Sequence, residues 1–157
     1  LIPIMSDTAA ETDTRVGTAA ENIRRLAALC GRGVITTIAE AEPLGPALPL
    51  DALLIAPCTG NTLAKLAHGI TDSAVTMAAK AHLRNGRPLI IALSTNDGLS
   101  GSAENIGRLL NRKNVYFVPF GQDDPEKKPC SLQADFTLAG AAVSAALEGR
   151  QLHPLLK

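Results

Sequence analysis

The sequence is poor in aromatic residues and carries no net charge. Its 157 residues include no tryptophan, one tyrosine and three phenylalanines, and 15 acidic side chains balance 15 basic ones. Proteins that bind nucleic acid through their surface need a basic stripe or a platform of aromatic rings. Since the sequence shows neither feature, we expect no nucleic-acid partner.

Long apolar runs and paired cysteines are also lacking. No apolar run reaches the roughly 20 residues of a membrane-spanning helix, so we expect no membrane segment. Cys30, Cys58 and Cys130 are an odd number without metal-ligand spacing, which predicts reduced thiols, no metal site and a cytoplasmic protein. Hydrophobic residues nevertheless make up 46% of the chain, which is enough for a single domain over residues 1–157. A neutral chain is poorly protected from self-association, so we expect a homo-oligomer.

Short apolar blocks alternate with amphipathic stretches along the chain. This alternation is typical of an α/β fold in which helices cover both faces of a parallel sheet. It predicts a doubly wound, flavodoxin-like or Rossmann-like three-layer sandwich. The expected strands are residues 1–5, 34–38, 52–56, 88–93 and 115–119, and the expected helices are residues 18–30, 61–67, 73–85, 103–112 and 132–148.

Two segments interrupt the alternation, and the chain opens in an unusual way. Residues 39–50 and 120–131 are too rich in proline or charge for a regular element, so we interpret them as candidate functional loops. The first apolar block, residues 1–5, starts the chain directly, whereas doubly wound domains usually begin with a strand and a glycine-rich phosphate loop. We therefore expect the domain to be incomplete at its N-terminus, without its first strand and first helix.

Small polar side chains follow three of the expected strands. Doubly wound sheets bind ligands at the carboxyl ends of their strands, and hydroxyl or amide groups there can hydrogen-bond a phosphate, a ribityl chain or a ring edge. Such residues are also ordinary helix caps, and for Ser6 and Ser94 this alternative stays open. The recurrence predicts one shared cofactor site formed by Ser6, Pro57, Thr59, Asn61, Thr62, Ser94, Thr95 and Asn96.

Residues 51–62 form the most informative of these three junctions. An apolar block ends in the turn Pro57-Cys58-Thr59-Gly60-Asn61-Thr62, which opens a helix that stops at Gly69. The first turn of such a helix offers free N–H groups and a positive dipole end to a ligand. A helix N-terminus can also activate a thiol. No base is recognisable near Cys58, however, so we interpret it as a packing residue.

The turn over residues 57–62 resembles the P-A-S-A-N-T motif of the FMN-binding flavoprotein family, which includes cysteine decarboxylases and flavin prenyltransferases. Pro57, Asn61 and Thr62 match the motif, and Thr59 replaces Ser conservatively. Within this family the chain is similar to the branch of dipicolinate synthase B subunits. That likeness covers the whole chain and rests on three strings, A-E-P-L-G-P at 41–46, S-T-N-D at 94–97 and Y-F-V-P-F-G-Q-D-D-P at 116–125.

The resemblance implies FMN as the cofactor, with Ser6 where the family places a phosphate-binding Ser and Asn96 where it places the Asn of a P-x-M-N motif. It also implies the dipicolinate synthase A subunit as the partner, carrying NAD(P). In this branch the two subunits oxidise a dihydrodipicolinate-type dicarboxylate to dipicolinate during sporulation, in the mother-cell cytoplasm of a spore-forming bacterium. Loss of two electrons and two protons aromatises the ring, and either cofactor is a candidate acceptor.

The sequence departs from the decarboxylases of the family at two points. No histidine occurs between Gly31 and Ala67, where their catalytic His would lie, and residues 97–101 replace their methionine-containing stretch. The catalytic residues are therefore unknown. Two alternatives stay open: a non-catalytic scaffold or activator of the dehydrogenase, and a stand-alone flavin-dependent decarboxylase or prenyltransferase.

Charged residues in two other segments are candidates for binding. The guanidinium of Arg15 is a candidate clamp for a substrate carboxylate or the cofactor phosphate, and a solvated surface arginine is the alternative. Asp123 and Asp124 lie next to each other in a proline-flanked loop. That position favours a turn with exposed carboxylates over acid-base or metal chemistry.

Overall fold

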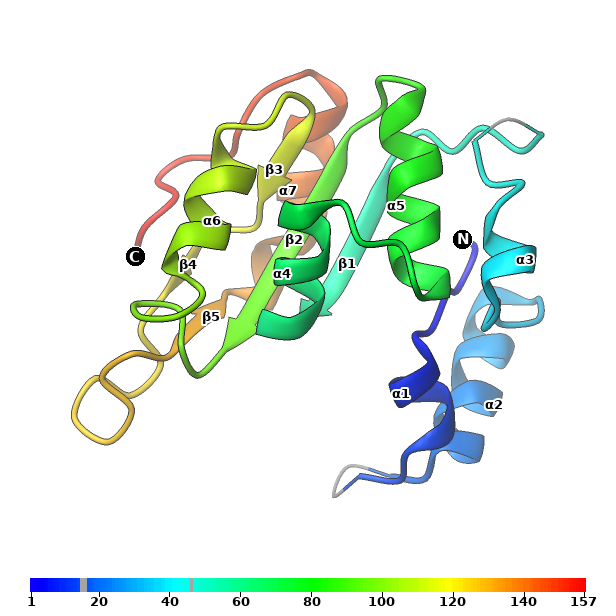
Figure 1. Ribbon diagram of the computed structural model, residues 1–157, viewed down its shortest axis with the longest axis horizontal. Helices are drawn as coiled ribbons and strands as arrows, with labels where there is room; N and C mark the ends of the chain where they lie inside the picture. Colours follow the sequence, from blue (N-terminus) through cyan, green and yellow to red (C-terminus); the bar gives the residue numbers. More distant parts are fainter. Residues whose placement is uncertain (15–16, 46) are drawn as a thin grey trace.

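The computed structural model describes residues 1–14, 17–45 and 47–157 as helices around a five-stranded sheet (Figure 1). No helix of this described part is long and apolar enough to cross a membrane. The strands are β1 (Leu53–Cys58), β2 (Leu89–Thr95), β3 (Val115–Phe117), β4 (Phe120–Gly121) and β5 (Leu132–Ala134). The helices are α1 (Asp7–Glu11), α2 (Ala19–Cys30), α3 (Ile38–Ala41), α4 (Gly60–His68), α5 (Ala74–Arg84), α6 (Ala103–Leu110), the 3-10 turn η1 (Phe136–Leu138) and α7 (Ala139–Leu147).

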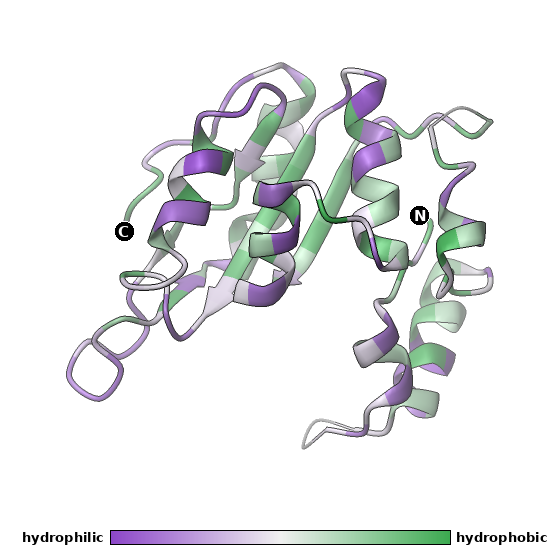
Figure 2. Cartoon of the chain, in the orientation of Figure 1, coloured by the Kyte–Doolittle hydropathy of each residue, from purple (hydrophilic) through white to green (hydrophobic). Residues whose placement is uncertain are grey.

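Strand β2 is the centre of the sheet. β1 and β3 run parallel to it on its two sides, and its first five residues are fully buried, as an uninterrupted apolar strand between two helical layers requires. Helices α4, α5 and α6 lie on one face and α7 on the other (Figure 1). The central strands are coloured as hydrophobic, and the helices in front of them combine hydrophobic segments with strongly hydrophilic ones (Figure 2). The predicted flavodoxin-like α/β fold is confirmed.

The far end of β2 carries an antiparallel extension that differs from the prediction. Ser94 and Thr95 pair with Gln133 and Leu132 of β5, and β5 pairs antiparallel with β4. The prediction of one helix over residues 132–148 is therefore wrong in its first part, because α7 starts only after β5 and η1. Buried, exposed and buried residues alternate along β5, which is the period of a strand. The alanine-rich stretch that follows hides this short signal in the sequence.

The strands expected at residues 1–5 and 34–38 form only an isolated parallel bridge between Ile4 and Ile35. Residue 38 instead begins α3, because Thr37 and Glu40 form a capping box in which each side chain satisfies the other's backbone N–H. The segment predicted as a loop over residues 39–50 therefore starts with the rest of this helix, and the one predicted over residues 120–131 starts with β4.

A buried histidine ties α5 to the start of β2. His82 is 1% exposed, and its Nε2 lies 2.9 Å from the carbonyl oxygen of Pro88. Burial lowers the pKa of His82, the Pro88 carbonyl opposes this effect, and the positive charge of Arg87 adds to it. The imidazole is therefore neutral in the folded protein at neutral pH.

This burial predicts a pH-dependent stability. The unfolded chain binds a proton on His82 as the pH falls below about 6.5, whereas the folded chain resists it, so the free energy of unfolding should fall by up to about 1.4 kcal/mol per pH unit. His82→Gln keeps a donor for Pro88 and should remove this dependence in urea denaturation between about pH 7 and pH 5. His68→Gln, at an exposed position, is the control and should retain the wild-type slope. Equal slopes in all three proteins would contradict the assignment.

Candidate functional site

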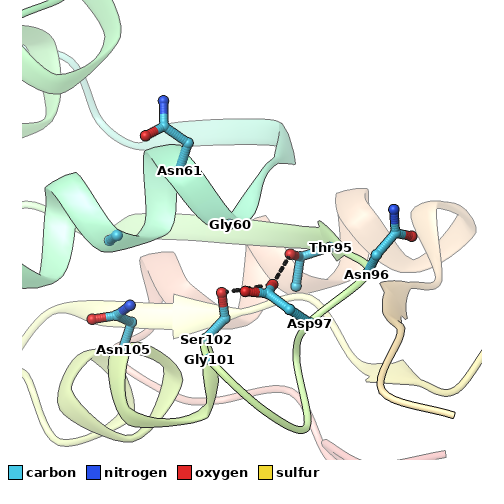
Figure 3. A pocket seen from close by; sticks show the side chains of 9 residues that line it. Gly60, Asn61, Thr95, Asn96, Asp97, Gly101, Ser102 and Asn105 are labelled. Carbon is cyan, nitrogen blue, oxygen red and sulfur yellow. Dashed lines mark hydrogen bonds between the residues drawn. The ribbon is translucent and has the colours of Figure 1, made fainter.

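A pocket of about 510 Å³ opens at the carboxyl end of β2 (Figure 3). It lies between the first turns of α4 and α6, where doubly wound sheets bind their ligands. Its volume is within the range of roughly 300 to 1,000 Å³ that small-molecule sites occupy. The pocket is lined by Gly60, Asn61, Ala64, Thr95, Asn96, Asp97, Gly101, Ser102 and Asn105.

Helix α4 begins at the turn that the sequence singled out. Thr59 is its N-cap, and the Thr59 hydroxyl accepts a hydrogen bond from the Thr62 N–H at 3.4 Å. Gly69, in the left-handed conformation, ends the helix. The predicted helix start and stop are both confirmed. The two threonine hydroxyls lie 3.4 Å apart and serve the helix start, while Gly60 and Asn61 reach the pocket.

Gly60 allows α4 to approach the end of β2 closely. A Cβ at this position would stand 2.6 Å from Thr95 Oγ1, 3.0 Å from Ser102 Oγ and 3.1 Å from Asp97 Oδ1. The first distance is a steric clash and the other two are tighter than ordinary contacts, so a larger residue would have to displace Thr95 and press on the other two side chains. Glycine is therefore required here by packing rather than by its backbone angles.

Asp97 gathers two hydroxyl groups beside this glycine. Thr95 Oγ1 and Ser102 Oγ both donate to Asp97 Oδ1, at 2.5 and 2.8 Å (Figure 3). These hydrogen bonds, that of Thr95 first, stabilise the charged form and lower the pKa of Asp97. The backbone carbonyl of Asp97 also accepts from the N–H groups of Ser100 and Ser102 at 3.0 Å. The residue thus fixes the whole turn between β2 and α6.

Three of the eight residues predicted to hold the cofactor line the pocket, namely Asn61, Thr95 and Asn96. Asn61 comes from α4 and Asn96 follows β2, and the side chain of Asn61 points away from the Asp97 cluster (Figure 3). Two predicted junctions therefore do meet at one pocket, as their positions at strand ends suggested. The other residues of these two junctions are not part of the lining: Thr59, Thr62 and Ser94 are its neighbours in the chain, and Pro57 lies further from it in the sequence.

The third predicted junction lies elsewhere in the described structure. The Ser6 hydroxyl accepts a hydrogen bond from the Ala9 N–H at 3.4 Å and caps α1, which packs against α2 on the far side of β1 from the pocket (Figure 1). Arg15, the predicted carboxylate clamp, lies outside the described residues. Cofactor binding by Ser6 and Arg15 stays a prediction.

Sequence reasoning missed Gly60, Asp97, Ser102 and Asn105 as site residues. A signal for part of this cluster exists, because a Thr-x-Asp pair followed by Ser-Gly-Ser is typical of a polar turn that hydrogen-bonds its own backbone. That local pattern does not indicate which distant glycine the turn will touch. The contact with Gly60 appears only when α4 and α6 pack side by side.

Cys58 is a packing residue, as the sequence predicted. Its side chain is fully buried at the end of β1, and its Sγ lies 3.8 Å from the carbonyl oxygen of Thr59. Burial raises the pKa of Cys58 to about 12. Since the thiolate is the nucleophilic form, this thiol is inert at neutral pH.

The acidic pair after β4 forms a turn held by local contacts. Asp123 pairs with Lys128 at 2.9 Å, and hydrogen bonds from Ser131 and then Lys128 lower the pKa of Asp123 to about 2. Asp124 accepts a hydrogen bond from the Lys127 N–H at 3.2 Å through its side chain. The predicted turn is confirmed, and both carboxylates are engaged within their own loop.

Fold and pocket together define the class: a flavodoxin-like α/β protein with a polar pocket at the end of its central strand. The Flavoprotein family model matches residues 10–143, and the chain belongs to this family. Over 154 residues the chain is 47% identical to the dipicolinate synthase B subunit of Bacillus subtilis (strain 168), in a match that covers 98% of this chain and 77% of that protein. The resemblance predicted from the motifs is therefore confirmed.

Solved structures agree with this placement. The dipicolinate synthase B subunit from Bacillus halodurans C matches with a TM-score of 0.91 and 44% identity, over 99% of this chain and 80% of that one. A dodecameric FMN-dependent UbiX-like decarboxylase from Escherichia coli O157:H7 matches with a TM-score of 0.57 and 29% identity, over 74% of this chain and 62% of that one. The chain is thus far more similar to the B subunit than to this decarboxylase.

The close approach at Gly60 predicts a specific loss of stability. Gly60→Ala places a methyl group against the Asp97 cluster and should lower the free energy of unfolding by about 1 to 3 kcal/mol in urea denaturation. Gly107→Ala is the matched control in α6, because a Cβ there meets nothing within 4 Å. The control should be neutral or stabilising by up to about 1 kcal/mol. Equal effects of the two substitutions would contradict the packing role of Gly60.

Proposed function

We propose that this chain is the flavoprotein subunit of a dipicolinate synthase, which binds FMN in the pocket between α4 and α6. With a nicotinamide-dependent A subunit it oxidises a dihydrodipicolinate-type dicarboxylate to pyridine-2,6-dicarboxylate in the cytoplasm of a sporulating cell. The observation that carries this proposal is the near full-length similarity to two dipicolinate synthase B subunits, at 47% and 44% identity.

The chemistry of the pocket supports a flavin. Amide groups of Asn61, Asn96 and Asn105 can each donate and accept hydrogen bonds, as the edge of a flavin ring and the hydroxyls of a ribityl chain require. Gly60 contributes backbone to the same lining. The family placement and the FMN dependence of the Escherichia coli relative point to the same cofactor.

The proposed reaction removes two electrons and two protons from the substrate ring. Bound FMN would supply a two-electron acceptor close to this chain, and NAD(P) on the A subunit is the other candidate acceptor. Asn61, from α4, and Asn96, from the turn after β2, would hold and orient the flavin. The dodecameric state of the Escherichia coli relative supports a homo-oligomer here as well.

The full-length protein should bind FMN, and the two asparagines should contribute. Asn61→Ala and Asn96→Ala each remove one side-chain amide and should weaken FMN binding about tenfold in fluorescence titration. Asn111→Ala, at the exposed C-cap of α6, is the matched control and should bind like wild type. Unchanged affinity in both pocket variants would contradict the pocket assignment. A wild-type protein that is colourless and does not bind added FMN would exclude the flavin itself.

Product formation in the presence of the A subunit tests the role of the chain in the reaction. Pyridine-2,6-dicarboxylate should accumulate only when both subunits are present, and Asn61→Ala should lower the rate to the extent that it empties the flavin site. An unchanged rate with the A subunit alone would exclude a catalytic role. A flavin-free variant that still supports the full rate would instead identify the chain as a scaffold or activator.

A further inference from the structure

Asp97 is the one charged residue among the described residues that line the pocket. Its carboxylate has a fixed position, since Thr95 and Ser102 both donate to its Oδ1, at 2.5 and 2.8 Å. The same hydrogen bonds lower the pKa of Asp97, so the group is an anion at neutral pH. The described pocket lining therefore carries one negative charge, and these hydrogen bonds hold it in position.

This carboxylate lies against the first residue of α4. Its Oδ1 is 3.1 Å from the position of a Cβ on Gly60. The first turn of a helix ordinarily attracts a phosphate, because free N–H groups and the helix dipole favour an anion there. Here the protein's own carboxylate lies against that turn, and a second anion would meet it in a site with no lysine or arginine among its described lining residues.

The second oxygen of Asp97 lies beside another residue of the pocket lining. Both hydroxyl groups donate to Oδ1, which leaves Oδ2 with its capacity to accept. Oδ2 lies 3.2 Å from the position of a Cβ on Gly101, another lining residue. An uncharged hydroxyl or N–H group can donate to such an oxygen, whereas an ionised phosphate or carboxylate group cannot.

We propose that Asp97 is a specificity-determining residue: it excludes phosphate and carboxylate groups from this pocket and reserves the pocket for an uncharged, hydrogen-bond-donating part of the flavin. This inference rests on the proposed flavin binding and refines it. The phosphate of FMN and the two carboxylates of the substrate then bind away from Asp97. Asp97 accepts a hydrogen bond from the flavin ring or from a hydroxyl group of the ribityl chain.

Riboflavin and FMN distinguish these parts because they differ only in the phosphate. In the full-length protein, Asp97→Asn removes the charge, keeps the shape and should weaken binding of both flavins by a common factor of about ten. The ratio of the two dissociation constants should stay within about twofold of wild type. Pyridine-2,6-dicarboxylate, titrated in the same way without flavin, should bind Asp97→Asn more tightly than wild type, because the variant lacks the charge that repels it, and unchanged binding would contradict the exclusion.

The matched control is Glu104→Gln, which removes the same charge from an exposed residue of α6 that pairs with Arg108 at 2.6 Å and lies outside the pocket lining. It should leave both flavin affinities unchanged. Asn105→Asp provides a second variant that is independent of the Asp97 cluster, because it adds a carboxylate to the same wall. Asn105→Asp should change the dissociation constants of riboflavin and FMN by the same factor.

Selective tightening of FMN by Asp97→Asn, selective weakening of FMN by Asn105→Asp, or unchanged binding of both flavins by Asp97→Asn would overturn the inference. The Asn105→Asp comparison decides the question if Asp97→Asn does not fold. A wild-type protein that binds neither flavin would instead overturn the proposed function. The two failures are therefore distinguishable in one set of titrations.

Discussion

The close contact of Gly60 with the hydrogen-bonded group of Thr95, Asp97 and Ser102 is the constraint on which the pocket depends. It joins the start of α4, the end of β2 and the start of α6 at one point. The central strand is buried over its first five residues and provides the fixed base. Without a glycine at the start of α4, the helix and the turn after β2 would not come close enough to form one wall.

Much of the fold could be predicted from the sequence because its signals are local. The apolar blocks of β1, β2 and β3 and the caps of α4 and α5 need only a few neighbouring residues to be recognised. Strand β5 was not predicted, because its alternating pattern is only three residues long and an alanine-rich helix follows it. The second apolar block, residues 34–38, forms only one bridge because the capping box at Thr37 starts a helix within it.

The candidate site was predictable in its position but not in its composition. Strand ends and the motif at residues 57–62 led to Asn61 and Asn96, which both line the pocket. Asp97 was part of the S-T-N-D string and of the departure from the decarboxylases, but neither observation marked it as a site residue. Its hydroxyl donors, Thr95 and Ser102, are close to it in the chain, whereas its contact with Gly60 joins segments that are distant in sequence. The wall of the pocket forms where the start of α4, the end of β2 and the start of α6 meet, so no single one of these segments predicts it.

The antiparallel pairing of β5 with the end of β2 links the pocket to the loop over residues 122–131. Thr95 pairs with Leu132 on its backbone and donates to Asp97 through its side chain. Leu99, beyond the Asp97 turn, donates its N–H to the carbonyl of Cys130 at 3.0 Å. The loop and the pocket wall are therefore connected by two backbone contacts. Contacts made to residues 122–131 are therefore connected to the Asp97 turn through two short backbone links.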